Sequence, residues 1–417
     1  MIIKRDGYVG ELIARRHNGL VKVITGMRRC GKSYLLFNLY RDYLLSQGVS
    51  PERLIEVAFD SRKNEGLRDP DALCEYVEAR MTDPGMHYIL LDEVQLLEDF
   101  EAVLNQFLRM GNADIYVTGS NSKFLSSDVI TEFRGRGDEV RVRPLSFAEY
   151  LPAHGGTPKE AWRDYYTYGG LPLTATLGTE EQRAAYLASQ FQNVYFLDII
   201  ERNKVKNVGD LDELVNVLAS SVGSLTNPNK LANAFKSIKQ ANVAPSTINT
   251  YIGYLQDAFL IDQALRYDVK GKRYINTPSK YYFTDVGIRN ARLNFRQQEE
   301  NHIMENVIFN ELKGRGFGVD VGIVEAREKG PEGRYARKQL EVDFIANQGS
   351  RRYYVQSAFA MDTPEKAEQE RKSLRHIDDS FKKIIVLRED IKLKRDEDGF
   401  VTMGIREFLL NPDSLDL

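Results

Sequence analysis

Apolar residues in the first third of the chain fall into short runs, and longer segments of helical periodicity lie between them. The apolar runs are VKVIT, RLIEVAF, YILLDE and ADIYVTGS, and the helical segments include KSYLLFNLYRDYLLSQ and FEAVLNQFLRMG. Strands that alternate with helices usually form a mainly parallel sheet that helices cover on both faces. Residues 21–146 are therefore predicted to form an α/β domain.

From about residue 147 the pattern becomes helical, and it changes twice more before the end of the chain. A helical lid and connector is followed by three helices and a hairpin with Lys-Gly-Lys at its tip, which is typical of a winged helix-turn-helix. The last segment returns to mixed α/β. The predicted parts are a core at 1–146, a lid and connector at 147–205, a winged helix-turn-helix at 206–298 and a terminal domain at 299–417.

Length, charge and cysteine content exclude several classes of protein. A chain of 417 residues is too long for one ordinary core, and no stretch approaches the roughly 20 apolar residues of a membrane span. The N-terminus lacks the pattern of a secretory signal, and the two cysteines form no CxxC motif. We expect a cytoplasmic protein with reduced thiols and no membrane partner. With a net charge of −3, a polynucleotide would have to bind at a local basic patch.

The segment GMRRCGKS directly follows the apolar run VKVIT and opens a helical segment. A glycine, four residues and Gly-Lys-Ser in this context predict a phosphate-binding loop: its backbone N–H groups surround phosphate oxygens, the lysine reaches the β- and γ-phosphates, and the serine hydroxyl binds Mg²⁺. We also expect alkylation of the loop thiol to block nucleotide binding. The predicted nucleotide-binding residues are Gly26, Met27, Arg28, Arg29, Cys30, Gly31, Lys32 and Ser33.

Two carboxylates follow the apolar run YILL, at the strand end where ligands sit in open α/β sheets. Asp92 is predicted to hold Mg²⁺ together with Ser33. Glu93 is placed to orient and polarise the attacking water, which would distinguish hydrolysis from nucleotide storage. The alternative is that Glu93 only caps the segment that follows.

Two further segments offer catalytic candidates. The strand IYVT ends in small polar residues, of which Ser120 and Asn121 either reach the γ-phosphate and the attacking water or act as an ordinary helix N-cap. In the segment FRGRG, Arg134 and Arg136 are either arginine fingers supplied by a neighbouring subunit or part of a solvated basic turn.

The order of motifs along the whole chain resembles a widespread prokaryotic family of AAA-type ATPases that carry a C-terminal domain of unknown function. The motifs are GMRRCGKS, YILLDEVQ, VTGSNSKFL, RGRG, VRPLSFAEY and YGGLP, followed by VYFLDIIERNKV, STINTYIGYLQDAFLI and EVDFIA. The resemblance implies a P-loop core with sheet order 5-1-4-3-2, a winged helix, a degenerate nuclease-like terminal domain, and ATP as the nucleotide.

The winged helix contains candidates for DNA contact. Thr247 and Asn249 lie near the start of its third helix, where recognition helices touch DNA, and the hairpin carries Lys270, Lys272 and Arg273. Residues 261–296 hold eight basic and three acidic side chains, a local charge of +5. Duplex DNA and a partner protein or intramolecular packing remain equal alternatives for this surface.

The terminal domain resembles the PD-(D/E)xK nuclease fold, and the resemblance matches three positions of its metal site. They are Glu305 on a helix, Asp343 in LEVDFIA and Gln356 in VQSA, where the nuclease pattern has a carboxylate; Ala358 stands where it has lysine. Gln356 brings no charge and Ala358 cannot activate water, so we expect a binding or structural role rather than cleavage.

Together these patterns predict a Mg²⁺-dependent ATPase in which ATP turnover changes the relation between the core and the C-terminal half. ATP is one partner; duplex DNA, a partner protein or a homo-oligomer are the others considered. One alternative is a DNA-binding or signalling module that uses ATP as a conformational ligand, and a second is an ATP-dependent nuclease. Glu93 favours hydrolysis, whereas Gln356 and Ala358 disfavour cleavage.

Overall fold

The computed structural model describes residues 2–119, 135–239, 243–296, 299–329 and 335–417. The chain divides into two compact units. The first comprises Met1–Pro144 and Asp257–Phe259, and the second comprises Leu145–Gln256 and Leu260–Leu417. Within the described ranges, no helix has both the length and the apolar character that crossing a membrane requires.

The first unit is built on a five-stranded parallel sheet in the order β2-β3-β4-β1-β5, which confirms the predicted order 5-1-4-3-2 read from the other edge. Every residue of β1 and of β3 is buried, as expected for strands that helices cover on both faces. The strands are β1 (Val21–Thr25), β2 (Leu54–Ala58), β3 (His87–Asp92), β4 (Ala113–Thr118) and β5 (Gly137–Arg141).

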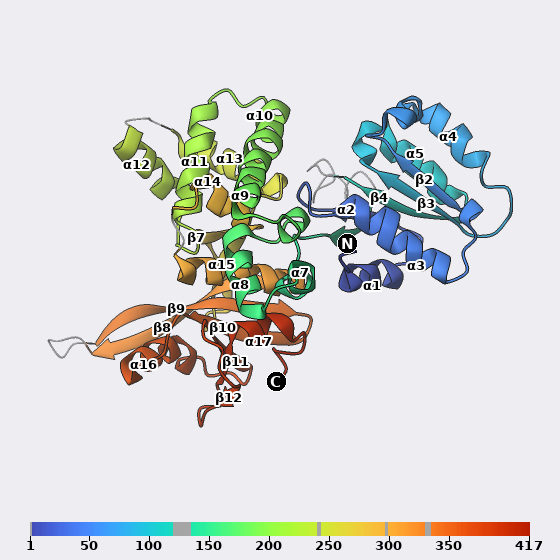
Figure 1. Cartoon of the computed structure of the whole chain (residues 1–417). Coiled ribbons are helices and arrows are strands. Elements are labelled where there is room, and N and C mark those ends of the chain that lie inside the picture. Colours follow the sequence, from blue (N-terminus) through green and yellow to red (C-terminus); the bar gives the residue numbers. More distant parts are fainter. Residues whose placement is uncertain (1, 120–134, 240–242, 297–298, 330–334) are drawn as a thin grey trace. The chain divides into compact units, whose positions relative to one another are not determined.

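Helices cover both faces of this sheet (Figure 1). Apolar side chains of α4 and α5 pack with those of β1–β4 in one core, whereas α1 and the helix after β1 lie on the other face. That helix has three parts in sequence, because a π-helical stretch at Leu35–Tyr40 separates α2 from α3. The helices are α1 (Asp6–Ala14), α2 (Lys32–Tyr34), α3 (Arg41–Ser46), α4 (Pro70–Glu78) and α5 (Phe100–Arg109), with 3₁₀ turns at Pro51–Arg53, Arg62–Arg68 and Val94–Leu96.

A buried polar network joins β1 to β4. Lys22 interrupts the apolar run VKVIT, and its ammonium group donates to the Asp114 carboxylate inside the protein. The Tyr116 hydroxyl donates to the same carboxylate at 2.9 Å, and the Tyr40 hydroxyl donates to Tyr116 at 2.5 Å. Burial lowers the pKa of Lys22, whereas Asp114 opposes that shift. The buried charges of Lys22 and Asp114 offset each other only when β1 and β4 keep this register.

The second unit begins with helices, two of which start with a capping box. Ser146 and Thr157 each accept from a backbone N–H three residues later, and a glutamate at that position returns the bond. The helices up to the hairpin are α7 (Phe147–His154), α8 (Pro158–Tyr168), α9 (Glu180–Ser189), α10 (Leu197–Asn203), α11 (Val208–Ser220), α12 (Pro228–Lys239) and α13 (Pro245–Asp257), with a 3₁₀ turn at Pro172–Ala175 and a π-helical stretch at Gln190–Phe196.

A buried aspartate fixes the Gly-Gly-Leu-Pro interruption between these helices. Asp285 caps α14 (Val286–Arg292) by accepting from the Ile288 N–H at 2.9 Å, and it also accepts from the Gly170 N–H at 2.8 Å. Burial raises the pKa of Asp285 to about 6, and the backbone N–H donors offset part of that shift. The carboxyl group therefore links two segments that are far apart in the sequence.

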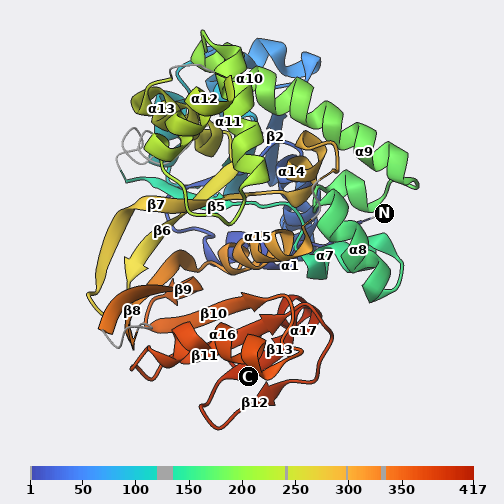
Figure 2. The same cartoon turned by 90° about the vertical axis from the view of Figure 1, so that its left-hand side faces the viewer.

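The hairpin and the C-terminal strands form one eight-stranded sheet in the order β12-β13-β11-β10-β9-β8-β6-β7 (Figure 2). Strand β6 pairs with β8 in parallel, so the hairpin joins the sheet through β6 and β7 is its edge strand. The residues on both sides of the boundary predicted at residue 298 belong to the second unit. The strands are β6 (Ile261–Asp268), β7 (Arg273–Phe283), β8 (Gly318–Lys329), β9 (Tyr335–Gln348), β10 (Arg351–Ala358), β11 (Lys382–Leu387), β12 (Lys394–Arg395) and β13 (Val401–Gly404). The remaining helices are α15 (Glu300–Gly314), α16 (Pro364–Arg375) and α17 (Ile405–Leu410).

Candidate functional site

The segment GMRRCGKS forms the connection between β1 and α2. Gly26 has a φ of 136°, and a Cβ atom there would lie 2.1 Å from the carbonyl oxygen of Val142, so only glycine fits. The buried Lys32 ammonium donates to the carbonyl oxygens of Gly26 and Met27 at 2.9 and 3.1 Å. The lysine is therefore held inside the loop by two backbone oxygen acceptors.

Asp92 joins the loop to β3. It is 4% exposed, and its Oδ1 atom accepts from the Ser33 hydroxyl at 3.0 Å and from the Thr118 hydroxyl. Burial raises the pKa of Asp92, and the two hydroxyl donors offset part of that shift. Strand β4 lies between β1 and β3, and Thr118 at its end reaches the end of β3 with its hydroxyl. Sequence reasoning did not identify Thr118 as part of this site.

Glu93 follows Asp92 in a left-handed backbone conformation, with a φ of 53°. Its backbone N–H donates to the Thr118 hydroxyl at 3.1 Å, and its carboxylate accepts from the Gln95 side chain. Non-glycine residues rarely adopt this conformation, which is enriched at functional sites. The Thr118 bond thus fixes the point at which the chain turns out of β3 and carries the Glu93 carboxylate to the strand end.

The oxygen atoms of Ser33 and Asp92 fit a magnesium ion. One hydroxyl and one carboxylate, 3.0 Å apart, are ligand types that Mg²⁺ prefers when phosphate oxygens and water complete its shell. A bound cation would also offset the burial that now disfavours the charged form of Asp92.

The middle residues of the loop point in different directions. Met27 and Cys30 are buried, whereas Arg28 and Arg29 are exposed. The Cys30 side chain is 0% exposed, and its Sγ atom lies 3.4 Å from the carbonyl oxygen of Val142, against the neighbouring chain segment. The thiol therefore packs into the core and is shielded from reagents, while the effect of its alkylation on nucleotide binding stays a prediction.

We therefore predict that Cys30 resists alkylation in the folded protein, with or without ATP. Cys74 is more exposed and should react first with N-ethylmaleimide, whereas both thiols should react after denaturation. Mass spectrometry of the two cysteine-containing peptides measures the difference. Rapid labelling of native Cys30 that ATP prevents would restore the original expectation.

Comparisons with known proteins agree with this geometry. A family model described as an AAA domain matches residues 18–151, and a model of a domain of unknown function matches residues 159–299. A Haemophilus influenzae protein described as uncharacterized is 32% identical over 98% of this chain and 99% of its own length. The chain belongs to the AAA-type P-loop ATPases.

More distant similarities to this chain include a curated relative and two solved structures. An uncharacterized Methanocaldococcus jannaschii protein, MJ1544, is 26% identical over 78% of this chain and 71% of its own length. The Orc1 protein of Aeropyrum pernix, solved with DNA, covers 70% of this chain and 93% of its own, with 10% identity and a TM-score of 0.31. The match to Cdc6p from Pyrobaculum aerophilum covers 74% of this chain and 94% of that protein, with 12% identity and a TM-score of 0.31.

Of the remaining catalytic candidates in the first unit, the structure describes only Arg136. Ser120, Asn121 and Arg134 lie outside the described residues. Arg136 precedes β5, whose first residue pairs with Val21 at the start of β1, and its guanidinium group donates to Asn105 at 3.1 Å. The phosphate loop follows the other end of this five-residue strand, about 16 Å along the sheet. Arg136 therefore lies at the opposite end of the strands from the loop of its own chain.

The basic residues of 261–296 do not form one exposed surface, so the local charge of +5 overstates the charge that a partner could reach. The side chains of Lys280, Arg289 and Arg292 are buried. The hairpin tip does expose Lys270, Lys272 and Arg273, and the α13 candidates are the exposed Asn249 and the half-buried Thr247. Of the tip residues, Lys270 lies 3.6 Å from Asp378 and Arg273 lies 3.4 Å from Asp268.

Two of the three nuclease-like positions, Glu305 and Asp343, lie beside Lys280, which the sequence analysis counted among the basic residues of 261–296. The Lys280 ammonium lies 2.8 Å from Glu305, 2.7 Å from Glu341 and 3.7 Å from Asp343. Burial alone would lower the pKa of Lys280, but the three carboxylates outweigh it and raise the pKa above the ordinary value. Gln356 accepts from the Asp343 N–H at 3.4 Å. Among the described residues, no group of three or more His, Cys, Asp or Glu side chains could hold a metal ion.

A β-bulge on β9 shapes this cluster. Asp320 and Gly322 of β8 pair with Ile345 and Val342, so two residues of β9 stand opposite one of β8. The extra residue turns both Asp343 and Phe344 toward α15: Asp343 lies beside Lys280 with Glu305, and the Phe344 ring lies 6.2 Å from that of Phe309. The Ser357 N–H then donates to Asp343 at 2.9 Å and fixes its carboxylate.

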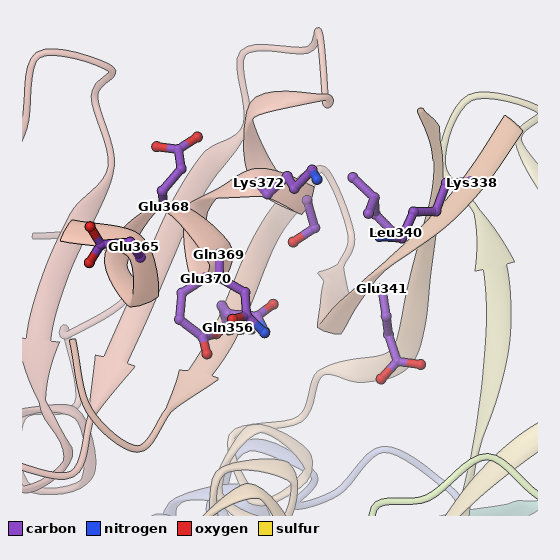
Figure 3. Close-up of a pocket in the computed structure, with 10 residues that line it drawn as sticks. Lys338, Leu340, Glu341, Gln356, Glu365, Glu368, Gln369, Glu370 and Lys372 are labelled. Atoms are coloured by element: carbon purple, nitrogen blue, oxygen red, sulfur yellow. Dashed lines mark hydrogen bonds between the residues drawn. The ribbon is translucent and has the colours of Figure 1, made fainter. Parts of the chain in front are cut away.

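A pocket of about 580 Å³ opens beside this cluster, between α16 and β9 (Figure 3). Gln356 donates to Glu370 of α16 at 3.2 Å, and the two side chains lie together in the close-up. Burial raises the pKa of Glu370, and the bond from Gln356 opposes that shift. Glu341 lines the opposite wall, and its carboxylate points away from the carboxylates of α16.

Proposed function

We propose that this chain binds and hydrolyses ATP with Mg²⁺ and couples its nucleotide state to the C-terminal half. The observation that carries the proposal is the 3.0 Å contact between Ser33 and Asp92, with Lys32 held in the same loop and Glu93 beside Asp92. This contact connects the phosphate loop to the strand that supplies the carboxylates. Membership of the AAA-type family supports the same function.

Each residue of the proposed site has its own task. The loop N–H groups and Lys32 would bind the phosphates, because oriented donors and a fixed cation stabilise anionic oxygens. Ser33 and Asp92 would hold Mg²⁺, which when bound neutralises charge on the phosphate oxygens. Glu93 would accept a hydrogen bond from the attacking water and orient it. Thr118 would position both carboxylates, since its hydroxyl contacts Asp92 and the Glu93 backbone.

Phosphate release by the purified full-length chain tests the proposal. We expect ATP turnover with Mg²⁺ and none with EDTA, and GTP in parallel tests the choice of nucleotide. The same assay with duplex DNA tests whether the C-terminal half alters the rate. ATP binding without turnover under all of these conditions would instead support the alternative in which ATP is a conformational ligand.

Arg136 enters the proposal only as a residue that acts on a neighbouring subunit. Its position at the opposite strand end from its own phosphate loop favours this arrangement over action within one chain. Specific activity should then rise with protein concentration as the oligomer forms. A rate per chain that is independent of concentration would remove Arg136 from the proposed site.

Duplex DNA is a second candidate partner, because the hairpin tip exposes three cationic side chains within four consecutive residues. We predict that changing Lys270, Lys272 and Arg273 together to alanine weakens duplex binding and reduces the slope of log K against log salt by up to about 3. Fluorescence anisotropy at several salt concentrations measures both quantities. The matched control is the triple alanine variant of Lys392, Lys394 and Arg395, which removes the same exposed charge elsewhere. Equal affinity and slope in both variants would exclude the hairpin as the DNA site.

A further inference from the structure

Lys280 is a fixed cation among three carboxylates that come from two different elements. Its ammonium lies within hydrogen-bond distance of Glu305 on α15 and Glu341 on β9, at 2.8 and 2.7 Å, and 3.7 Å from Asp343. The Lys280 side chain is 3% exposed. Strand β7, which carries it, belongs to the hairpin, so the cluster connects the hairpin to the helix and to the centre of the C-terminal sheet.

We propose that Lys280 is a built-in cation that closes this carboxylate cluster to divalent metal ions. A site for Mg²⁺ or Mn²⁺ consists of oxygen ligands that converge on one point, and here the ammonium occupies that point. A divalent ion bound to the same oxygens would lie within a few ångströms of the ammonium. At that distance, in a buried site, repulsion between like charges is large.

The other positions of the nuclease-like pattern agree with a closed site. The side-chain oxygen of Gln356 accepts from the Asp343 backbone, and its amide group donates to Glu370. Ala358 is buried and brings no polar side-chain atom. The Tyr282 hydroxyl also donates to Glu305 at 2.7 Å, on the same oxygen that contacts Lys280. The residues present therefore do not fit the metal that a nuclease-like fold implies, and the cluster instead serves as a metal-independent ionic link.

Exchanging Lys280 for a neutral side chain tests the proposal. Lys280→Met keeps most of the side-chain volume but leaves three carboxylates without their cation, so we expect a lower melting temperature in EDTA. Mn²⁺ should then bind the cluster and raise the melting temperature by about 5–10 °C at a concentration about 100 times Kd. The measurement uses differential scanning calorimetry of the full chain without nucleotide. A folded Lys280→Met protein that gains nothing from Mn²⁺ would overturn the proposal.

Two variants show where the ion binds. Lys280→Arg keeps a cation in the cluster and should show no response to Mn²⁺ beyond that of the wild type. The double variant Lys280→Met with Asp343→Asn removes one carboxylate and should lose the gain seen with Lys280→Met alone. A gain that survives in the double variant would place the ion elsewhere and would overturn the proposal.

The wild-type protein provides a test that does not depend on whether Lys280→Met folds. The wild type and Asp343→Asn are titrated with Mn²⁺, and electron paramagnetic resonance measures the free ion. We expect both proteins to bind the same number of Mn²⁺ ions. Binding to the wild type that is lost in Asp343→Asn would show that Lys280 moves aside and that the cluster is an open metal site.

Discussion

Replacing Glu93 by glutamine should reduce ATP turnover by at least about 100-fold while ATP binding stays close to that of the wild type. A positioned general base typically contributes 10²–10⁴ in rate, and glutamine keeps the size of the side chain but removes its basicity. The contacts proposed to hold the phosphates and Mg²⁺ come from other side chains, namely Lys32, Ser33 and Asp92. Steady-state phosphate release and equilibrium titration with a fluorescent ATP analogue measure turnover and binding separately.

Glu98→Gln is the matched control for this experiment. Glu98 is exposed and lies five residues further along the chain, so the same chemical change there should leave both quantities unchanged. Wild-type turnover in Glu93→Gln would contradict the catalytic role. In that case Glu93 would serve only the turn after β3, where its N–H donates to Thr118.

The sheet of the first unit could be predicted from the sequence because local pattern and global fold agree there. The runs VKVIT and YILLD are apolar enough to be buried on both faces, and β1 and β3 are buried at every position. The strand order followed from the resemblance. The strand that ends at Thr118 was predicted as well, but the catalytic candidates were assigned to the polar residues that follow it.

Thr118 could have been found from the predicted strand order alone. In the order 5-1-4-3-2, β4 lies between the strand before the phosphate loop and the strand that carries Asp92. The last side chain of β4 must therefore reach the edge where the two halves of the site meet. A hydroxyl there can donate and accept at the same time, which is how Thr118 contacts Asp92 and the Glu93 backbone at the end of β3.

Lys280 could not be placed by counting charge, because a sum over the hairpin ignores the direction of each side chain. Side chains two residues apart in a strand share a face, so Lys280 lies on the same face of β7 as the buried Tyr282. Both contact Glu305. The pairing of β6 with β8 was the other unforeseen feature, since it depends on contacts between distant parts of the sequence.

Replacing Lys32 by alanine should lower ATP affinity by about 100-fold and thereby abolish measurable turnover. Charge-assisted hydrogen bonds contribute about 1.5–3 kcal/mol, and the lysine is the cation that the loop itself holds, through the carbonyl oxygens of Gly26 and Met27. Its partners are loop carbonyl groups rather than core side chains, so the melting temperature without nucleotide should change little. The two substitutions should therefore have different effects: Lys32→Ala loses binding and turnover together, whereas Glu93→Gln loses turnover alone.

Isothermal titration calorimetry with ATP and Mg²⁺ measures the loss, and Lys159→Ala supplies the control because it removes an exposed lysine from the start of α8. Wild-type affinity in Lys32→Ala would mean that the loop backbone alone holds the phosphates. Since Lys32 would then have no ligand to contact, its burial against two carbonyl oxygens would be a structural feature of the loop, and the proposed phosphate site would lose its cation.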